Sequence, residues 1–559
     1  MRTLNYFFSI AIVLVATGCR KQQMASQPVK PLDKTGTKTL TATSYPSYNT
    51  SPLPPDQTGV TSTAVQIASR IRLGFNIGNT MEAPNNEQGW GAPMITQAFI
   101  DKVKQSGFTA IRIPCNWDWS HVPDSTTAKI DPAWLARVQQ VVQYCVNDGL
   151  YVILNIHWDG GWLQGNCTVA KQPAVNALQK ALWEQIATSL RGFDEHLLFA
   201  SANEPAVTDA TGMSVLLSYH QTFINAVRST GGKNSYRTLV VQGPNTDITE
   251  TNNLMNTLPT DPASNRMMAE VHYYTPYNFC LMDADASWGN MFYYWGSGYH
   301  STADPSRNAT YGEESDVNAY YLSMKTKFVN QGIPVIMGEY SAGRRTSLTG
   351  AAYDLHTASR AYWYNYVTRQ ALLNGMLPFL WDTGSIIDRS TYAVKDQQQL
   401  AALVQGGLNG SPAIQDGSVY QIFNRNSFKA LEFAGWGIAN QTLADQWDYA
   451  AGANQQFKVL SAGGGAYLLT PMHTSGKCLE INGWSTANGG FADLWAYTGT
   501  GGNNQKWLIQ PTDNGYYKII NVNSGKALEV SGLSLSNGGG VAQWDYNGTR
   551  NQQWAFLKL

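Results

Sequence analysis

The segment LLFASANE, residues 197–204, is an unbroken apolar run that ends in an asparagine and a glutamate. Seven other runs of this kind lie along the chain, at residues 72–78, 109–114, 151–157, 238–244, 267–274, 334–340 and 377–382. Unbroken apolar runs of this length are typical of strands that are buried on both faces, as in a parallel sheet. We therefore expect eight parallel strands.

Helix-length amphipathic stretches separate these runs, as in repeated strand–helix units. They are expected at residues 134–147, 174–191, 215–228, 321–330 and 358–374. The first one follows Asp131 and Pro132, which are a capping side chain and a residue that needs no N–H partner at a helix start. Eight strands that alternate with helices predict an α/β fold, a (β/α)8 TIM barrel, over residues 64–408.

The tail of the chain repeats itself with a period of about 48 residues. Two short motifs recur three times, KALE or KCLE at residues 429–432, 477–480 and 526–529, and a glutamine two residues before an aromatic at 455–457, 505–507 and 552–554. One such unit cannot bury its apolar face alone, but three together can. The repeat predicts an all-β β-trefoil domain over residues 415–559.

The first residues have the pattern of a bacterial targeting signal. An apolar stretch at residues 4–15 is followed by small residues and Cys19, which resembles a lipoprotein cleavage site. We expect residues 1–19 to be a lipoprotein signal peptide with Cys19 as the lipidated residue, and a plain signal peptide is the alternative. Residues 20–63 are rich in Pro, Ser, Thr, Gln and Lys and are expected to be a disordered tether.

These signals predict a protein of the bacterial cell envelope, bound to the membrane through Cys19, or else a secreted one. Arg20 and Lys21 do not look like an inner-membrane retention signal, which favours an outward-facing position on the outer membrane. The 38 basic and 39 acidic residues nearly cancel and give no support for a nucleic-acid partner. We expect a monomer. Whether Cys167 and Cys280 pair is left open.

Catalytic groups of such a barrel lie at the carboxyl ends of its strands. The polar and aromatic residues at the ends of the runs are Arg112, His157, Asn203, Glu204, His272, Tyr274, Glu339 and Trp381. Glu204 and Glu339, on the fourth and seventh strands, are expected to face each other across the barrel mouth. Two such carboxylates can serve glycoside hydrolysis as proton donor and nucleophile. The histidines have no metal-ligand spacing, so neither a metal nor a cofactor is expected.

The barrel segment resembles glycoside hydrolase family 5, the cellulase A family of clan A. The matching stretches are GFNIGNT at 74–80, GFTAIRIP at 107–114, YVILNIH at 151–157, NEP at 203–205, VHYYTPYNF at 271–279, IPVIMGEY at 333–340 and FLWD at 379–382. The resemblance implies that Glu204 is the general acid/base and that Glu339 is the nucleophile. Arg112 would lie near Glu339 and keep it ionised, since a positive charge lowers a carboxylate pKa, and Tyr274 would bond to the same carboxylate.

The resemblance also implies a sugar-binding role for four other residues. Asn203 would bind the sugar 2-OH, and Trp381 would stack beneath the sugar in the −1 subsite. His157 and His272 would complete the polar floor, the second close to Glu204. Two departures from the family pattern bear on the substrate: a phenylalanine at 75 where tryptophan is frequent, and a tryptophan at 158 where a second histidine is frequent.

The tail resembles the ricin-type β-trefoil lectins, also called family 13 carbohydrate-binding modules. This resemblance implies an acid and an aromatic residue for sugar binding in each repeat. The pairs are Glu432 with Trp447, Glu480 with Trp495, and Glu529 with Trp544. The family usually has aspartate where these glutamates stand, so a purely structural trefoil is the alternative.

The sequence as a whole predicts a retaining endo-β-1,4-glucanase that acts on a β-glucan such as cellulose, mixed-linkage glucan or xyloglucan. A β-mannanase or xylanase with the same mechanism is the nearest alternative, because the catalytic residues would be shared. A surface glycan-binding lipoprotein with a silent barrel is the alternative from another class. It would explain the anchor and the trefoil, but not the intact set of catalytic residues.

Overall fold

The computed structural model describes residues 42–118, 120–407, 414–450, 452–497, 502–512 and 516–559. Within it, Ala42–Leu559 form one compact unit. The predicted signal peptide, Cys19 and the first part of the predicted tether lie outside the described residues. Among the residues that are described, no helix is long and apolar enough to cross a membrane.

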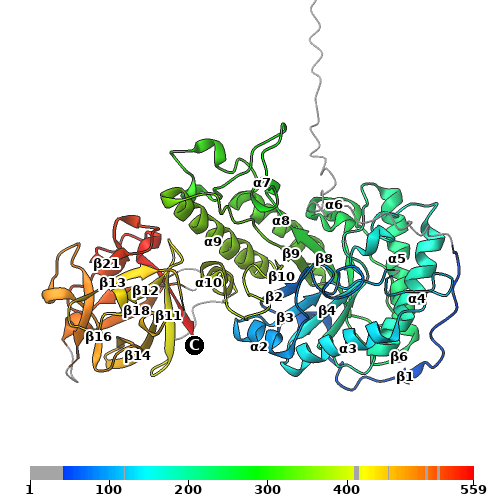
Figure 1. Cartoon of the computed structure of the whole chain (residues 1–559), viewed down its shortest axis with the longest axis horizontal. Helices are drawn as coiled ribbons and strands as arrows, with labels where there is room; N and C mark the ends of the chain where they lie inside the picture. Colours follow the sequence, from blue (N-terminus) through cyan, green and yellow to red (C-terminus); the bar gives the residue numbers. More distant parts are fainter. Residues whose placement is uncertain (1–41, 119, 408–413, 451, 498–501, 513–515) are drawn as a thin grey trace, which may run out of the picture. The chain divides into compact units, whose positions relative to one another are not determined.

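Eight strands of the described chain form a closed parallel barrel (Figure 1). In chain order they are β2 (Gly74–Ile77), β3 (Ala110–Ile113), β4 (Tyr151–Asn155), β5 (Leu197–Ala200), β7 (Leu239–Gln242), β8 (Met267–Tyr273), β9 (Val335–Tyr340) and β10 (Met376–Asp382). The barrel closes where β10 pairs with β2, Phe379 opposite Gly74. Each strand coincides with one of the eight predicted runs, which confirms the barrel.

Helices surround the barrel (Figure 1). They are α2 (Gln97–Gln105), α3 (Pro132–Asn147), α4 (Gln172–Leu190), α5 (Ala210–Ser229), α6 (Ile248–Leu254), α8 (Glu314–Lys327), α9 (Gly350–Leu373) and α10 (Gln397–Gly406). The five predicted helices are confirmed, and α3 begins as expected, with the Asp131 side chain accepting a hydrogen bond from the Ala133 N–H. Helices α5, α8 and α9 begin about one to two turns earlier than predicted, because their first turns are largely exposed and so lie outside the apolar pattern.

One apolar cluster fills the amino-terminal half of the barrel. Helix α1 (Ala64–Ala68) contributes Ala64 and Ile67 to it, and the strands contribute inward-facing residues such as Ile153 and Leu198. These side chains are withdrawn from water, which provides most of the stabilisation of a barrel interior. Helix α1 packs against this end, whereas Arg112, His272 and Glu339 lie toward the carboxyl ends of their strands.

Part of the segment predicted as a tether packs on the barrel instead. Strand β1 (Leu53–Pro55) pairs in parallel with β6 (Gly231–Gly232). The backbone N–H of Tyr48 donates a hydrogen bond of 2.7 Å to the buried Glu184 side chain. The tether prediction is therefore wrong for residues 42–63. Their composition shows no apolar periodicity, but their polar groups find partners in barrel residues that are distant in sequence.

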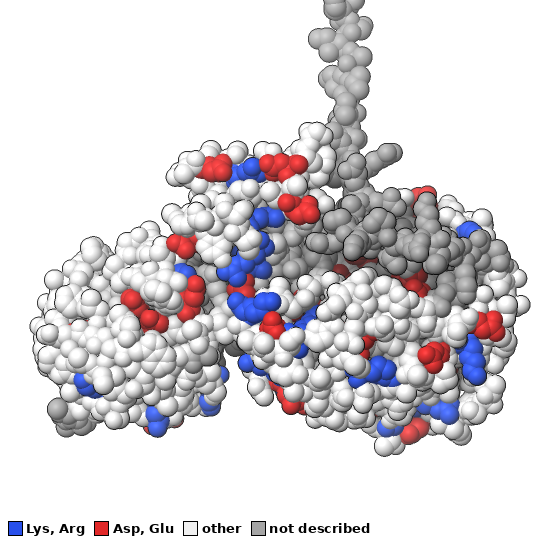
Figure 2. Space-filling model, in the orientation of Figure 1, with Lys and Arg blue, Asp and Glu red and all other residues white. Residues whose placement is uncertain are grey.

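One face of the molecule carries charged residues of both signs. On the face shown in Figure 2, Lys and Arg side chains alternate with Asp and Glu, and much of the trefoil surface carries neither. This distribution agrees with the low overall share of charged residues, 14%. A nucleic acid would need a continuous basic face, which this side of the protein does not offer.

An antiparallel β domain follows the barrel. In its described part the strands are β11 (Val419–Asn424), β12 (Ala430–Phe433), β13 (Thr442–Trp447), β14 (Gln456–Gly463), β15 (Ala466–Pro471), β16 (Lys477–Ile481), β17 (Ala492–Ala496), β18 (Trp507–Pro511), β19 (Tyr517–Asn521), β20 (Ala527–Val530), β21 (Gly539–Trp544) and β22 (Trp554–Lys558). Strand β22 pairs with β11 and so joins the end of the domain to its start. The predicted β-trefoil is confirmed.

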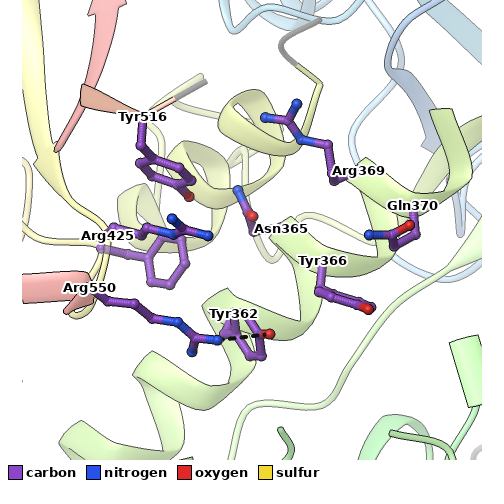
Figure 3. A pocket seen from close by; sticks show the side chains of 9 residues that line it. Tyr362, Asn365, Tyr366, Arg369, Gln370, Arg425, Tyr516 and Arg550 are labelled. Atoms are coloured by element: carbon purple, nitrogen blue, oxygen red, sulfur yellow. Dashed lines mark hydrogen bonds between the residues drawn. The ribbon is translucent and has the colours of Figure 1, made fainter. Parts of the chain in front are cut away.

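The third repeat of the trefoil lies against α9 of the barrel. The Arg550 guanidinium stands 4.3 Å from the ring centre of Tyr362 and donates a hydrogen bond of 3.1 Å to its hydroxyl (Figure 3). Arg425 stands 4.5 Å from the ring centre of Tyr516, whose hydroxyl donates to Gln405 of α10 at 2.9 Å. These contacts tie the third repeat to the barrel.

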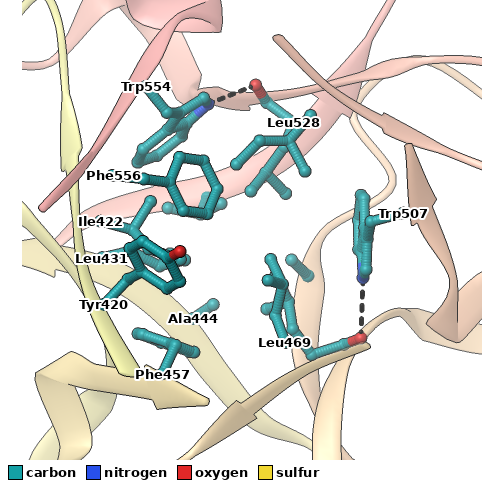
Figure 4. Close-up of a cluster of buried hydrophobic side chains, with 14 of the residues drawn as sticks. Tyr420, Ile422, Leu431, Ala444, Phe457, Leu469, Trp507, Leu528, Trp554 and Phe556 are labelled. Atoms are coloured by element: carbon teal, nitrogen blue, oxygen red, sulfur yellow. Dashed lines mark hydrogen bonds between the residues drawn. The ribbon is translucent and has the colours of Figure 1, made fainter. Parts of the chain in front are cut away.

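The trefoil core is built from equivalent positions of the three repeats (Figure 4). The indole N–H of Trp507 donates to the Leu479 carbonyl at 3.0 Å, and that of Trp554 donates to the Leu528 carbonyl at 2.9 Å. Phe457 takes the same place in the first repeat and is also fully buried. The aromatic residues of the repeated motif therefore mark the fold and do not face a ligand.

The cysteines of the described chain are all free and buried. Cys167 and Cys280 do not pair, which settles the question that the sequence left open. Burial raises the pKa of the Cys167 thiol to about 12, so this thiol stays protonated and unreactive.

Candidate active site

The residues predicted from the strand ends converge at the carboxyl end of the barrel. Four lie on strands, and four follow a strand by one to four residues: Arg112 on β3, His157 after β4, Asn203 and Glu204 after β5, His272 on β8 and Tyr274 after it, Glu339 on β9, and Trp381 on β10. Because the strands are parallel and the barrel is closed, these positions share one mouth.

Glu204 and Glu339 form a close carboxylate pair. An oxygen of Glu204, an oxygen of Glu339 and a ring nitrogen of His272 all lie within 4.8 Å of one another. Glu339 is buried, whereas the Glu204 side chain keeps 18% of its surface exposed. Retaining glycoside hydrolases place their carboxyl groups roughly 5–5.5 Å apart, whereas inverting enzymes need room for a water between them. The spacing therefore suits direct attack by one carboxylate.

Two side chains hold Glu339 in place. Arg112 donates to one of its oxygens at 2.9 Å, and the Tyr274 hydroxyl donates to the other at 3.0 Å. Arg112 also donates to the Asn203 side chain at 2.9 Å. The contacts predicted for Arg112 and Tyr274 are present. Burial raises the pKa of Glu339, and His272 and Arg112 oppose this shift without cancelling it.

His272 bridges the site from below. One ring nitrogen lies 2.8 Å from Glu204 and 3.7 Å from Glu339, and the other lies 3.2 Å from Glu270. Burial alone would lower the pKa of His272, but these three carboxylates raise it to about 9. His272 is therefore a cation that lies between the carboxylates of Glu204, Glu339 and Glu270.

Glu270 is a member of the site that the strand-end analysis missed. It is fully buried, 3.0 Å from the Arg112 Nε and within reach of His272, and the Gln242 side chain donates to it at 2.6 Å. Burial raises the pKa of Glu270, but Arg112 and His272 bring it below the usual value. The carboxylate is therefore ionised and balances the positive charges beneath the nucleophile.

The sequence did contain a signal for Glu270. It precedes His272 by two positions on β8, and alternate residues of a strand point to the same side. On the neighbouring strand, Gly338 leaves room for it, since a Cβ there would overlap the Glu270 carboxylate. The Asn76 side chain lies beside Arg112 in the layer beneath the carboxylate pair. Its oxygen accepts a hydrogen bond from Arg112 at 3.0 Å, and its amide donates one to the Gly338 carbonyl at 2.8 Å.

Replacing Glu270 by glutamine should lower kcat by roughly 10²-fold, because Arg112 and His272 lose the charge that positions them. The free energy of unfolding should fall by about 3 kcal/mol, since a buried ion pair is broken. Glu87→Gln is the matched control, because Glu87 is also buried and pairs with Arg137 at 2.8 Å outside the site. It should destabilise the protein and leave kcat unchanged. Equal kcat losses in the two variants would contradict a positioning role for Glu270.

The same variant should change how stability depends on pH. The pKa of His272 rises from its usual 6.5 to about 9 on folding. A basic group with a raised pKa contributes stability that is complete below 6.5 and is lost as the pH rises through 9. In Glu270→Gln this loss should be smaller and should be complete at lower pH, because the pKa of His272 in the folded protein is raised less. Urea unfolding across this range checks the prediction, and superimposable pH profiles would refute it.

The remaining barrel predictions have mixed outcomes. The rings of His157 and Trp381 are nearly parallel, with an angle of 8° between their planes and 5.8 Å between their centres. Burial, with Arg112 nearby, lowers the pKa of His157 well below its usual value, so this ring is neutral. Phe75 is fully buried and packs on Phe108 at 5.0 Å and on Phe99 of α2 at 6.2 Å between ring centres, so its ring lies on the helix side of the barrel wall. Trp158 is 57% exposed.

The acid and tryptophan implied for each trefoil repeat lie on one hairpin. These are Glu432 and Trp447 on β12 and β13, Glu480 and Trp495 on β16 and β17, and Glu529 and Trp544 on β20 and β21. Each glutamate accepts a hydrogen bond from the first glutamine of the repeated motif: Gln455 at 2.6 Å, Gln505 at 2.8 Å and Gln552 at 3.0 Å. The motif therefore also holds the acids in place.

A (β/α)8 barrel whose mouth holds two carboxylates at this spacing, with an arginine and a tyrosine on one of them, is a glycoside hydrolase. Residues 74–385 match the cellulase family, glycosyl hydrolase family 5. The chain belongs to this family, and it is an endo-β-1,4-glucanase of the family. Residues 411–495 and 503–558 match the ricin-type beta-trefoil lectin domain-like family.

Similar proteins with known activities cover the barrel. A xyloglucan-specific endo-beta-1,4-glucanase of Bacteroides ovatus is 36% identical over 384 residues, 65% of this chain and 74% of its own. A xyloglucan-specific β-1,4-glucanase from a ruminal metagenomic library, solved with XXLG, has a TM-score of 0.57 and 39% identity, and the match covers 63% of this chain and 100% of that one. A broad-specificity endoglucanase of Ruminococcus champanellensis, solved with cellotriose, has a TM-score of 0.53 and 31% identity. The match covers 61% of this chain and 98% of that one.

Proposed function

We propose that this enzyme cuts internal β-1,4 bonds in the backbone of xyloglucan by double displacement, with retention at the anomeric carbon. The observation that carries the mechanism is the carboxylate pair, with oxygens within 4.8 Å at the ends of the fourth and seventh barrel strands. The substrate is supported by the two similar proteins named for xyloglucan, at 36% and 39% identity.

In the first step Glu339 attacks the anomeric carbon, and Glu204 gives its proton to the leaving oxygen. The aglycone part of the chain departs, and a covalent glycosyl-enzyme remains. Arg112 and Tyr274 hold the attacking carboxylate through both of its oxygens, so little motion is needed to reach the carbon. The half-buried Glu204 keeps access to the leaving group.

In the second step Glu204 takes a proton from water, and the resulting hydroxide attacks the same carbon and releases Glu339. The positively charged His272, 2.8 Å from Glu204, favours the carboxylate form that this step needs. Asn203, fixed by Arg112, would bond to the sugar 2-OH, and Trp381 would support the sugar ring from below. Both contacts position the anomeric carbon over Glu339.

An assay with five soluble polysaccharides tests the substrate. The substrates are xyloglucan, barley mixed-linkage glucan, carboxymethylcellulose, glucomannan and xylan, followed by reducing ends, oligosaccharide lengths and the anomer that is released first. We expect kcat/KM on xyloglucan to exceed that on the unbranched glucans by roughly tenfold or more, because branch contacts add transition-state binding. The first product should be the β-anomer.

Other outcomes of this assay separate the alternatives. Equal rates on the glucans would indicate a broad-specificity endoglucanase, as in the relative from Ruminococcus champanellensis. Activity on glucomannan or xylan alone would replace the substrate and keep the mechanism. Release of the α-anomer would refute double displacement. No activity on any of the five polysaccharides would favour a glycan-binding lipoprotein with an inactive barrel.

We also propose that the mature protein is anchored through lipid on Cys19 and faces outward from the outer membrane. The support is the apolar stretch followed by Ala16, Thr17, Gly18 and Cys19. The wild-type protein should take up radiolabelled palmitate and sediment with membranes, whereas Cys19→Ala should do neither. Surface protease should digest it in intact cells. Soluble wild-type protein without label would leave a plain signal peptide as the explanation.

A further inference from the structure

The loop that follows β2 supports the indole of Trp381. Trp381 is only partly buried, and its ring lies against the backbone of Gly78. A Cβ at Gly78 would stand 2.8 Å from the indole and 3.1 Å from the carbonyl oxygen of Asp382, so only glycine leaves room for the ring at this position. The Gly78 N–H also donates a hydrogen bond of 3.0 Å to the Asp382 carbonyl. The plane of the indole therefore depends on where this loop is held.

Glu82 shapes the loop from within. Its carboxylate accepts hydrogen bonds from the backbone N–H groups of Asn79 and Thr80, the second at 2.9 Å. These are the two residues that directly follow Gly78 in the chain. Asn79 has a left-handed backbone with φ 60°, a conformation in which a hydrogen-bonded N–H group helps to fix the turn. The side chain of Glu82 thus sets the path of the backbone that supports the indole.

Arg389 holds the other side of the same contact. It lies in the loop that follows β10, and its guanidinium donates a hydrogen bond of 2.5 Å to the Asp382 carbonyl. This oxygen is the one that also accepts from Gly78. Strands β2 and β10 are neighbours in the barrel, with Asp382 paired to Ile77. Arg389 therefore fixes the backbone beside Trp381 at the point where the two loops meet.

Both charged groups are buried at a cost. Glu82 is 7% exposed and Arg389 is 8% exposed. Burial raises the pKa of Glu82 to about 7 and lowers the pKa of Arg389, although each charge favours the ionised form of the other. Among the described residues, Nε and Nη1 of Arg389 have no hydrogen-bond partner. Stability alone does not explain two buried charges with such incomplete pairing, because apolar side chains would fill the same space at lower cost.

We propose that Glu82 and Arg389 are positioning residues of the reaction, which hold the loops after β2 and β10 together and so fix the plane of Trp381 beneath the sugar. Both are buried, so they act through the backbone of Gly78 and Asp382 and do not touch the substrate. A tilted indole would misplace the anomeric carbon relative to the nucleophile. The inference rests on the function proposed above, in which Trp381 supports the sugar ring.

A double-mutant cycle with Trp381→Ala tests this proposal. The cycle is measured as kcat/KM on whichever of the five polysaccharides the enzyme cleaves best. Glu82→Gln should lower kcat/KM by roughly tenfold in the otherwise unaltered enzyme, because the indole is no longer held flat. In the Trp381→Ala background the same change should cost less than about twofold, since the group that it positions is absent. Arg389→Met, which removes the charge and keeps an unbranched side chain, should behave in the same way.

The cycle also separates positioning from folding. A smaller fraction of folded enzyme would lower kcat/KM by the same factor with and without Trp381. Glu87→Gln is the matched control, because Glu87 is a buried carboxylate of the same loop that pairs with Arg137 instead. It should leave kcat/KM unchanged in both backgrounds.

Three results would overturn the inference in an enzyme that remains active. They are equal losses from Glu82→Gln in the two backgrounds, no loss from Glu82→Gln in the presence of Trp381, and unchanged kcat/KM in Trp381→Ala. Each of them would leave the proposed hydrolysis of xyloglucan intact. An unaltered enzyme that is inactive on all five polysaccharides would overturn the proposed function, and this inference with it.

Discussion

Glu339→Ala should lower kcat on every glycan substrate by roughly 10⁴-fold or more, since no other group can form the covalent intermediate. The loss should appear in kcat with KM nearly unchanged, because the carboxylate makes no bond to carbon in the enzyme–substrate complex and begins to form one in the transition state. The variant should fold, as Arg112 keeps its contacts with Asn203, Asn76 and Glu270. Initial rates on xyloglucan oligosaccharides check the loss of activity, and circular dichroism checks that the variant folds.

Chemical rescue makes the assignment of Glu339 specific. Alanine leaves space beside the anomeric carbon, so an added small anion such as azide can attack in place of the carboxylate. With an aryl glycoside that has a good leaving group, Glu339→Ala should form the α-glycosyl azide, which has the inverted configuration. A β-azide from this variant would assign the nucleophile to a different residue.

Glu204→Gln should cause the second large loss, and the size of this loss should depend on the leaving group. A sugar hydroxyl is a poor leaving group and needs the proton, so kcat on polysaccharide should fall by roughly 10³-fold or more. A dinitrophenolate leaves without a proton, so formation of the glycosyl-enzyme should be much less affected. Pre-steady-state release of dinitrophenol should therefore show a burst followed by slow turnover, because the second step still lacks its base.

Two comparisons separate Glu204 from its neighbours. The charge on Glu204 is one of those that raise the pKa of His272, so Glu204→Gln should also move the loss of stability with rising pH to lower values. His272→Asn keeps the size of the side chain and removes the charge, and it should lower kcat on both leaving groups by similar factors. If Glu204→Gln slowed both leaving groups equally, a role as general acid would be untenable.

Much of the fold could be predicted because its signals are local. Each barrel strand is buried on both faces, so an apolar run such as residues 151–157 is visible without knowing its partners. Residues 197–204 also show where the strand ends, and a barrel places its catalytic groups at such ends. Glu204 and Glu339 followed from this rule. The threefold repeat was visible for the same reason, since each unit carries its own copy of the pattern.

Other features depend on partners that are distant in the chain. Composition suggested a tether for residues 42–63, yet Tyr48 bonds to Glu184, 136 residues away. The role of Glu270 appears only when Arg112 and His272 are seen on either side of it. Nothing local predicts that Trp436 packs on Gly452, because this glycine belongs to the next hairpin.

The sequence by itself determined the order of the strands, the trefoil repeat and the two glutamates at the strand ends. These follow from side-chain periodicity and chain direction, which act over a few residues. The tertiary structure decided the spacing of the carboxylates, the charge of His272 and the contact of the third trefoil repeat with α9. Each of these depends on burial and on electrostatic interactions between residues far apart in sequence, whose strength is set by distances that only the folded chain defines.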